Sequence, residues 1–456
     1  MRITRRDLMR GAGRFVSAVL LGKGAIGRTR PRRLVNAQAF KSLNGADAGP
    51  LSGARLYEDV IAYYNLGEHR TATESDLRTS QWLIEQLRAT GLKATSQPFG
   101  LRQFFVHQTR LTIGDRGGDR NIRAFPLWFP RGTGPSSIVG PVTLLDTRAE
   151  MRSVQGKIAL VRFPFESRSA VVSGSGHAEA ILAASKAGAS AVVAITEGST
   201  KEIIALNALA GAEPWPIPVV LISPHDEGGL MSAARSGAKA SLLVDGEDDH
   251  DARAKNVIAR LDRGKDLIVI STPQSGWFRC AGERGPGIAL FLGLARWASR
   301  RPSGASFLFV STSGHELGGL GMRAFQKELA PPPERVLCWI HLGAGIATYS
   351  WEETASGLKR LREPDSRRSL MTSRDLVSML TTTFAGLPGL TPVVDRAVGE
   401  FEFMLKAGYR TFGIAAGHRF HHTSADSPEM TGPEILEPVG RALVNSVESV
   451  ERNAKV

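Results

Sequence analysis

Cysteine is nearly absent from this sequence, which has only Cys280 and Cys338 among its 456 residues. Two cysteines cannot cross-link a chain of this length, so a disulfide-stapled protein is excluded. A hydrophobic fraction of 42% with 22% charged residues is ordinary for a folded chain and excludes a disordered or collagenous one. We therefore expect a globular protein that is larger than one typical domain.

Long apolar runs are missing as well. The best apolar stretch, residues 15–22, is well short of the roughly 18 residues that a membrane-spanning helix needs, and it contains Ser17. Stable insertion of the folded chain into a membrane is therefore not expected.

Positive charge is concentrated at one end of the chain. The formal net charge is +13, of which residues 1–39 carry +9 through ten Lys and Arg against one acidic residue, leaving +4 for residues 40–456. A nucleic-acid-binding domain usually carries its basic residues on the folded body. Nucleic acid is therefore not the expected partner.

The basic N-terminal segment has the layout of an export signal. Arg5 and Arg6 precede a weakly apolar stretch, and Ala-Gln-Ala at 37–39 follows a second basic stretch. This layout resembles a twin-arginine (Tat) signal peptide at 1–39, which implies a mature chain that begins near Phe40 and acts in the periplasm or outside the cell. The alternative is a basic nucleic-acid-binding arm, but such an arm has no use for an apolar core followed by a small-residue site.

Short strands dominate the predicted structure between residues 125 and 247. The strand-like runs are 142–145, 157–162, 190–195 and 218–222, separated by Gly and Pro, with one helix at 178–187. The sequence at 156–161 and the Ala-Gly-Ala at 187–189 resemble a protease-associated domain. We interpret 125–247 as such a domain, inserted as a lid or interaction module.

The flanking segments predict a different architecture. A linker at 40–54 leads to an α/β domain made of 55–124 and 248–456, which begins with helices at 56–64 and 75–90. Buried strands follow at 266–271, 306–311, 336–341 and 411–415, with a helix at 288–297. This alternation predicts an α/β fold in which helices cover both faces of a mostly parallel sheet. Ligands bind beyond the carboxyl ends of such strands, so the residues after each run form the candidate site.

Three side chains at those positions suit a metal ion: Glu283, Glu316 and His422. Two carboxylates and one imidazole are a ligand set that zinc accepts, with a fourth position left for water or substrate. Each residue also has an ordinary structural interpretation. Either glutamate can cap the helix that follows it, and the histidine can be a loop residue with its own hydrogen bonds.

The segments around these residues resemble the zinc aminopeptidases and their relatives, the glutamate carboxypeptidases and glutaminyl cyclases. His-Thr-Ser-Ala-Asp at 422–426 resembles the final His element of that family, and His-Glu-Leu-Gly at 315–318 resembles its Glu-Glu element. The resemblance spans about 55–450. It implies a bridging metal ligand at Glu283, further ligands at Glu316 and His422, and Asp426 as the residue that orients His422.

The chain departs from that family at three ligand positions and at the general base. Thr272 and Gln274 replace a His-x-Asp pair, Gly343 replaces a later Asp, and His315 replaces the catalytic glutamate. The resemblance therefore implies that one metal site is lost and that a single zinc remains on the three ligands above.

His315 is the candidate catalytic residue, because a neutral histidine can accept a proton from water. Its alternative is a packing or hydrogen-bonding role in a remodelled pocket. His341, at the end of the third strand, is a candidate replacement ligand. A distinct chemistry would be a Cys280 nucleophile near the same rim, activated by His315, with a buried and inert thiol as its alternative.

Two functions are left open by the sequence. The first is an exported hydrolase that cuts peptides or related small amides with one zinc. The second is a binding or regulatory protein that has kept the scaffold and lost catalysis. The sequence fixes neither the substrate nor the oligomeric state.

Overall fold

The computed structural model describes residues 49–115, 118–145, 153–165, 170–171, 174–208, 213–302, 304–394 and 396–453. The predicted signal at 1–39 and residues 40–48 of the predicted linker lie outside the described residues. The first helices are α1 (Gly53–Asn65) and α2 (Glu74–Ala89), close to the predicted ranges. Each begins after a hydroxyl residue, Ser52 or Thr73, whose side chain accepts a hydrogen bond from a first-turn N–H.

Four parallel strands form the centre of the main sheet. Their spatial order is β10 (Ser306–Thr312), β9 (Leu267–Pro273), β11 (Val336–Leu342) and β16 (Thr411–Ala415). Every residue of β9 and β10 is buried, as their continuous apolar runs predict for strands covered on both faces. Antiparallel strands flank the four: β8 (Lys239–Leu261) beside β10, and β14 (Ser369–Thr372) beside β16, followed by β15 (Pro392–Val393). The predicted α/β fold with a mostly parallel sheet is confirmed.

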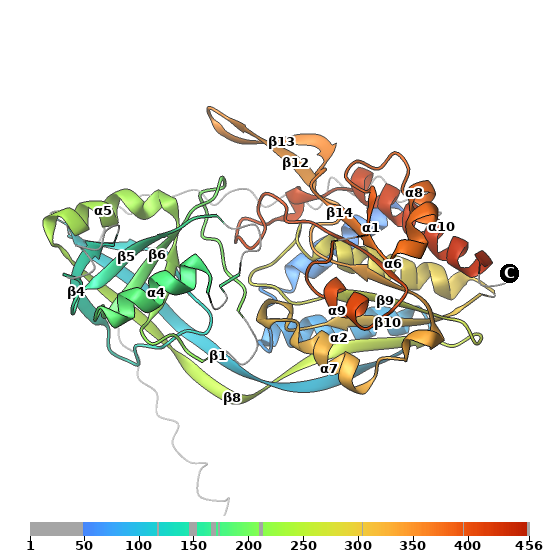
Figure 1. Cartoon of the computed structure of the whole chain (residues 1–456), viewed down its shortest axis with the longest axis horizontal. Helices are drawn as coiled ribbons and strands as arrows, with labels where there is room; N and C mark the ends of the chain where they lie inside the picture. Colours follow the sequence, from blue (N-terminus) through green and yellow to red (C-terminus); the bar gives the residue numbers. More distant parts are fainter. Residues whose placement is uncertain are drawn as a thin grey trace, which may run out of the picture. The chain divides into compact units, whose positions relative to one another are not determined.

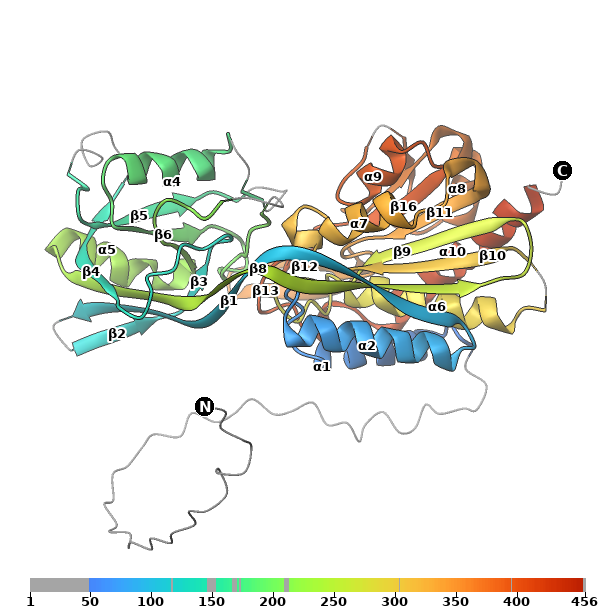
Figure 2. The same cartoon turned by 90° about the horizontal axis from the view of Figure 1, so that it is seen from below.

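Helices cover both faces of this sheet. Figure 2 shows α1, α2 and α6 (Gly285–Arg300) on one face, with α7 (Leu320–Glu328) and α9 (Phe401–Lys406) on the other. The alternation of side chains along β9 matches these layers, because Ile268 and Ile270 pack in one core while Val269 packs with Phe325 and Met404. The remaining helices of this part are α8 (Val377–Thr383) and α10 (Pro433–Asn453). Within the described residues, no helix combines the length and apolar composition needed to cross a bilayer.

Two long strands form a ladder that the sequence analysis did not predict. β1 (Lys93–Asp115) pairs antiparallel with β8 from Lys93↔Arg260 to Ile113↔Ala240, and β2 (Gly118–Ile122) pairs with the end of β1. The register is irregular between Leu101 and Gln103 and between Val106 and Gln108. Figure 1 shows the ladder as a continuous ribbon. The acidic run in the middle of β8 has no alternating apolar pattern, so nothing in the sequence indicated a strand there.

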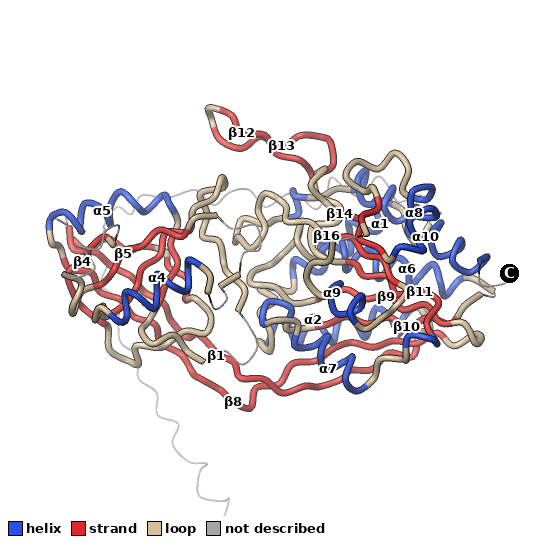
Figure 3. Tube along the Cα trace, in the orientation of Figure 1, coloured by secondary structure: helices blue, strands red, loops and turns tan. Residues whose placement is uncertain are grey.

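The segment between β1 and β8 continues the same sheet. β4 (Ile138–Leu144) pairs with β8, and the sheet then runs through β5 (Ile158–Phe163), β6 (Ala191–Thr196), β7 (Val219–Ile222) and β3 (Ala124–Pro126). Among the described residues of this segment are the helices α4 (Gly176–Lys186) and α5 (Glu227–Ser236). The range 125–247, predicted as a protease-associated domain, therefore contains β4 to β7 and ends inside β8. A separate hairpin, β12 (Tyr349–Thr354) and β13 (Gly357–Pro364), is visible in Figure 3.

Candidate metal centre

The predicted site residues meet at the carboxyl ends of the central strands. Glu316 follows β10, His422 follows β16, and Glu283 precedes α6 in the loop after β9. These three side chains are 3%, 1% and 0% exposed, respectively. The centre is therefore a buried cluster of charged and titratable groups.

Glu283 faces two adjacent histidines. Its Oε1 lies 3.5 Å from Nε2 of His422, and its Oε2 lies 3.8 Å from Nδ1 of His421. Within the described part of the chain, none of these four atoms has a hydrogen-bond partner, and one ligand atom from each residue lies within 4.8 Å of the others. Buried polar atoms without partners are rare, and two imidazoles with a carboxylate are a ligand set found in catalytic zinc sites. The residues therefore fit one metal ion.

The protonation states of this group also suit a metal. Burial by itself would raise the pKa of Glu283, but Arg284, His421 and His422 hold that pKa well below its ordinary value. Burial lowers the pKa of His421 well below its ordinary value. A carboxylate and a neutral imidazole are the forms that bind metal ions. His421 is not among the site residues predicted from the sequence. Its position directly before His422 is the signal that could have identified it as a ligand.

Glu316 has different partners. Its Oε1 accepts a hydrogen bond from Nη2 of Arg284 at 2.7 Å, and its Oε2 accepts one from Oγ of Ser275 at 2.7 Å. The same Nη2 of Arg284 lies 3.0 Å from Oε1 of Glu283. The guanidinium thus stands between the two carboxylates.

Asp426 supports the centre through the backbone. Its Oδ1 accepts from the N–H of Gly282 at 2.6 Å and its Oδ2 from the N–H of Glu283 at 2.9 Å. The sequence analysis expected Asp426 to accept from the ring of His422. In the structure, Nδ1 of His422 instead lies 3.0 Å from the carbonyl oxygen of Ala205. Asp426 therefore positions Glu283, and a backbone carbonyl orients His422.

The backbone of His422 is itself unusual. Its φ is 60°, in the left-handed region that residues with a side chain rarely adopt. Such a conformation costs on the order of 1–3 kcal/mol and persists where the surrounding structure enforces it, often at functional sites. This conformation is consistent with a functional role for His422.

His315 pairs with a carboxylate that the sequence analysis did not identify. Its Nδ1 lies 3.2 Å from Oε1 of Glu400, and Oγ1 of Thr312 donates to Oε2 of Glu400 at 2.9 Å. Burial would raise the pKa of Glu400, but His315 holds it below its ordinary value. A carboxylate that orients an imidazole is the arrangement of many general bases. Glu400 lies far from His315 in sequence, so no local motif connects the two.

No family model and no curated protein matches this sequence. The structure does have solved counterparts. A zinc aminopeptidase from Bacillus subtilis matches with a TM-score of 0.70 over 89% of this chain and 97% of its own, at 18% identity. The chain has the zinc aminopeptidase fold. A peptidase precursor from Shewanella amazonensis also matches with a TM-score of 0.70, over 88% of this chain and 94% of its own at 16% identity. An aminopeptidase from Aneurinibacillus matches with a TM-score of 0.60, over 88% and 94% at 17% identity.

At the three positions that were expected to lack metal ligands, the residues present make contacts within the protein. Oγ1 of Thr272 donates to the carbonyl of Leu342 at 2.8 Å, and Nε2 of Gln274 donates to Oγ of Ser80 at 2.7 Å. A Cβ added to Gly343 would lie 2.8 Å from the carbonyl oxygen of Ile414, so a side chain there requires movement of the backbone. These three positions offer no charged ligand for a second metal.

The two alternative residues of the sequence analysis are also buried. His341 is 2% exposed, its Nδ1 lies 3.0 Å from Oγ of Ser271, and burial lowers its pKa to about 4. Cys280 is 1% exposed, and burial followed by the charge of Glu283 raises the pKa of its thiol well above the ordinary value. A buried, protonated thiol is a poor nucleophile. The surroundings of Cys280 therefore support a buried and inert thiol.

Residues 203–208, here called the cover segment, lie over the centre. The N–H of Ala205 donates to the carbonyl of His422 at 2.9 Å, and the carbonyl of Ala205 lies 3.0 Å from Nδ1 of the His422 ring. The N–H of Ala208 donates to the carbonyl of Glu316 at 2.9 Å. Oδ1 of Asn207 accepts from Nε1 of Trp277 at 2.9 Å. The hollow beside Glu316 and Trp277 measures only about 10 Å³, roughly the room for one water molecule. The cover segment therefore packs against His422 and Glu316, while the side chain of His421 keeps an exposure of 20%.

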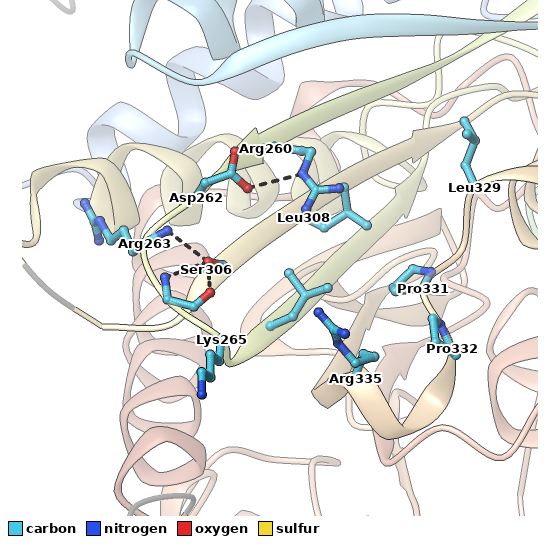
Figure 4. A pocket seen from close by; sticks show the side chains of 12 residues that line it. Arg260, Asp262, Arg263, Lys265, Ser306, Leu308, Leu329, Pro331, Pro332 and Arg335 are labelled. Carbon is cyan, nitrogen blue, oxygen red and sulfur yellow. Dashed lines mark hydrogen bonds and ion pairs between the residues drawn. The ribbon is translucent and has the colours of Figure 1, made fainter.

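An open hollow lies at the opposite ends of the strands. It measures about 570 Å³ and is lined by residues before β9, at the start of β10 and after α7. Figure 4 shows Arg260, Arg263, Lys265 and Arg335 around it, with Asp262 bonded to Arg260. It lacks the paired carboxylate and histidines of the metal centre. It is therefore a surface depression on the side of the fold away from the centre.

Proposed function

We propose that this protein is a hydrolase of the zinc aminopeptidase type that acts on peptides or related amides with a single metal ion. The observation that carries the proposal is the group of buried ligand atoms on Glu283, His421 and His422, which lie within 4.8 Å of one another and make no hydrogen bond within the described residues. Zinc is the preferred ion because the donor set is two nitrogens and a carboxylate. The solved counterparts named as zinc aminopeptidases support a peptide substrate.

The chain supplies the rest of the chemistry from its own side chains. A zinc ion bound here would polarise a carbonyl group and acidify a water molecule. His315 is the proposed proton acceptor, at the ring nitrogen that is not turned toward Glu400. Glu400 holds the ring in place and stabilises its charged form once the proton is taken. The cover segment shields the His422 side of the centre, and we expect it to shift when a peptide binds there.

Metal content is the first test. We expect about one zinc per chain in mature protein prepared without chelators, measured by plasma mass spectrometry. His421→Ala and His422→Ala should each lose the ion, while His107→Ala, on the exposed surface of β1, should keep it. Two tightly bound ions, or zinc that is retained in both centre variants, would contradict the proposed site.

A second candidate is a binding or regulatory protein on the same scaffold. Two observations favour it: the cover segment is hydrogen-bonded to the backbone of His422 and of Glu316, and Arg284 binds one carboxylate oxygen of Glu316. Hydrolysis of a broad panel of aminoacyl amides and short peptides separates the candidates. Zinc-loaded protein that binds peptides in calorimetry but cleaves none of the panel would favour the binding protein.

Export through the Tat system is part of the proposal. It is supported by Arg5 and Arg6, the weak apolar stretch and the Ala-Gln-Ala site before Phe40. Replacing both arginines with lysine should leave the precursor in the cytoplasm, as judged by fractionation and mass. Normal export of the doubly substituted precursor would contradict it.

A further inference from the structure

Arg284 is a buried cation shared by two carboxylates. Its side chain is 1% exposed, and Nη2 lies 2.7 Å from Oε1 of Glu316 and 3.0 Å from Oε1 of Glu283. Nε donates to the backbone carbonyl of Ser275 at 2.8 Å, which fixes the plane of the guanidinium. Two carboxylates from different segments of the chain are thus joined by one side chain.

The charge balance of the centre depends on this residue. Buried carboxylates require a positive partner, because an isolated buried charge is very costly. An arginine guanidinium stays protonated in proteins, so Arg284 keeps its positive charge between the two carboxylates. A permanent positive charge therefore lies at the point where a metal ion bound by the same two glutamates would otherwise provide it.

The position of Arg284 also explains why Glu316 and the two histidines do not form one set of metal ligands. Oε1 of Glu283 lies 3.0 Å from Nη2 of Arg284 and 3.5 Å from Nε2 of His422, and its Oε2 lies 3.8 Å from Nδ1 of His421. Glu316 is occupied on both oxygens, by Arg284 and by Ser275. The ligand set that the resemblance implies is therefore split, and His421 rather than Glu316 groups with Glu283 and His422.

We propose that Arg284 is a built-in cation that takes the metal position between Glu283 and Glu316. A bound zinc ion is thereby confined to the histidine side of Glu283, a statement that rests on the proposed function. The role of Arg284 does not require that the wild-type protein binds zinc.

The test is a double-mutant cycle of Arg284 and Glu316 on the full mature chain. Zinc affinity is measured for each variant by calorimetry with chelator competition. Arg284→Gln should bind zinc at least about tenfold more tightly than the wild type, because the like charge is gone. In the wild-type background, Glu316→Gln should change zinc affinity little. In the Arg284→Gln background, the same Glu316→Gln change should remove the gain, because Glu316 has become a ligand.

Two controls separate this role from general stability. Arg284→Lys keeps the positive charge and should retain wild-type zinc affinity. Arg296→Gln removes the cation of another buried pair, with Asp59, and should lower stability without any gain in zinc binding. Zinc affinity in Arg284→Gln that equals that of the wild type, or that does not respond to Glu316→Gln, would overturn the proposal.

Misfolding of Arg284→Gln also has a defined meaning. If the variant folds only when zinc ions are present during refolding, a metal has replaced the guanidinium, which supports the proposal. Loss of the fold that zinc does not reverse would overturn it. A wild type without zinc beside an Arg284→Gln variant that gains it would support the role of Arg284 and contradict the one-metal function.

Discussion

Nε2 of Gln274 lies 3.3 Å from Oδ1 of Asp76, which joins the end of β9 to α2 inside the core. Oδ2 of Asp76 accepts hydrogen bonds from Oγ of Ser313 at 2.6 Å and from the N–H of Ala72 at 2.9 Å. The carboxyl group is fully buried, and burial raises its pKa to about 7. A position where the resemblance expects a metal ligand has thus become part of a structural network.

The first prediction concerns the pH dependence of stability. Because the pKa of Asp76 is about 7 in the folded chain and near 3.8 ordinarily, the folded chain holds an extra proton between those values. The stabilising contribution of Asp76 is full below about pH 4 and is lost as pH rises through about 7. Relative to Asp76→Asn, the wild type should lose a few kcal/mol of unfolding free energy over this range, on the order of 1.4 per pH unit.

Urea unfolding of both proteins at several pH values from about 4 to about 8 measures this difference directly. Using the difference between the two proteins cancels the opposing titrations of other buried groups, such as His341. A difference that does not vary with pH would show that Asp76 titrates as an ordinary carboxyl group.

The second prediction concerns the pair of Glu400 and His315. Burial would raise the pKa of Glu400, but His315 holds that pKa below its ordinary value of 4.5. The stabilising contribution of the Glu400 carboxylate to the folded state is therefore present above about pH 4.5 and is lost as pH falls through the folded pKa. Glu400→Gln should therefore cost about 2 kcal/mol near neutral pH and less in acid. Glu402→Gln, on the same helix but more exposed, should cost little. Equal losses in the two variants would contradict the pairing.

The third prediction concerns the cover segment. Asn207→Ala removes the acceptor for Nε1 of Trp277 and should cost about 1 kcal/mol of stability. It should also let acrylamide quench the fluorescence of Trp277, with Trp277→Phe defining the background from the other tryptophans. Asn121→Ala, on the exposed strand β2, is the matched control. Unchanged quenching in Asn207→Ala would mean that this hydrogen bond does not hold the cover segment in place.

The elements with strong local patterns were predictable from the sequence. The buried strands β9, β10, β11 and β16 were predicted within about two residues, because continuous apolar runs bounded by Gly and Pro are distinctive. The strands β1 and β8 were not predicted. Their stability comes from long-range pairing with each other, and the acidic run at 247–251 hides the strand pattern.

The site was predictable only in part, for a related reason. Glu283 and His422 could be selected because each follows a recognisable element. The contacts of Arg284 with Glu316, of Glu400 with His315, and of Ala205 with His422 join residues that lie far apart in sequence or depend on side-chain direction. Such partners are set by tertiary packing, which a local pattern does not encode.

The fourth prediction concerns the segment between β1 and β8. Replacing residues 102–251 with Asn-Gly would close a hairpin on the paired residues Leu101 and Ala252 and keep the ladder from Lys93 onward. We expect this chain to unfold cooperatively. Removing only 125–247 should give a less stable, aggregating protein, because the remaining part of β1 would lose its partner strand. Urea unfolding and size-exclusion chromatography compare the two. If the variant that lacks 125–247 is the more stable of the two, the inserted domain begins after residue 124 and ends before residue 248.

The β1–β8 ladder also limits how the length of this chain can change over evolution. Side chains alternate between the two faces of each strand, so one residue lost from β1 alone would turn every later side chain of that strand to the opposite face. Tolerated insertions and deletions should therefore occur as matched pairs, one in each strand, or fall at the two irregularities near Leu101 and Val106. The paired strands therefore keep a fixed length, and we expect natural variation in chain length to occur in the loops beyond their ends.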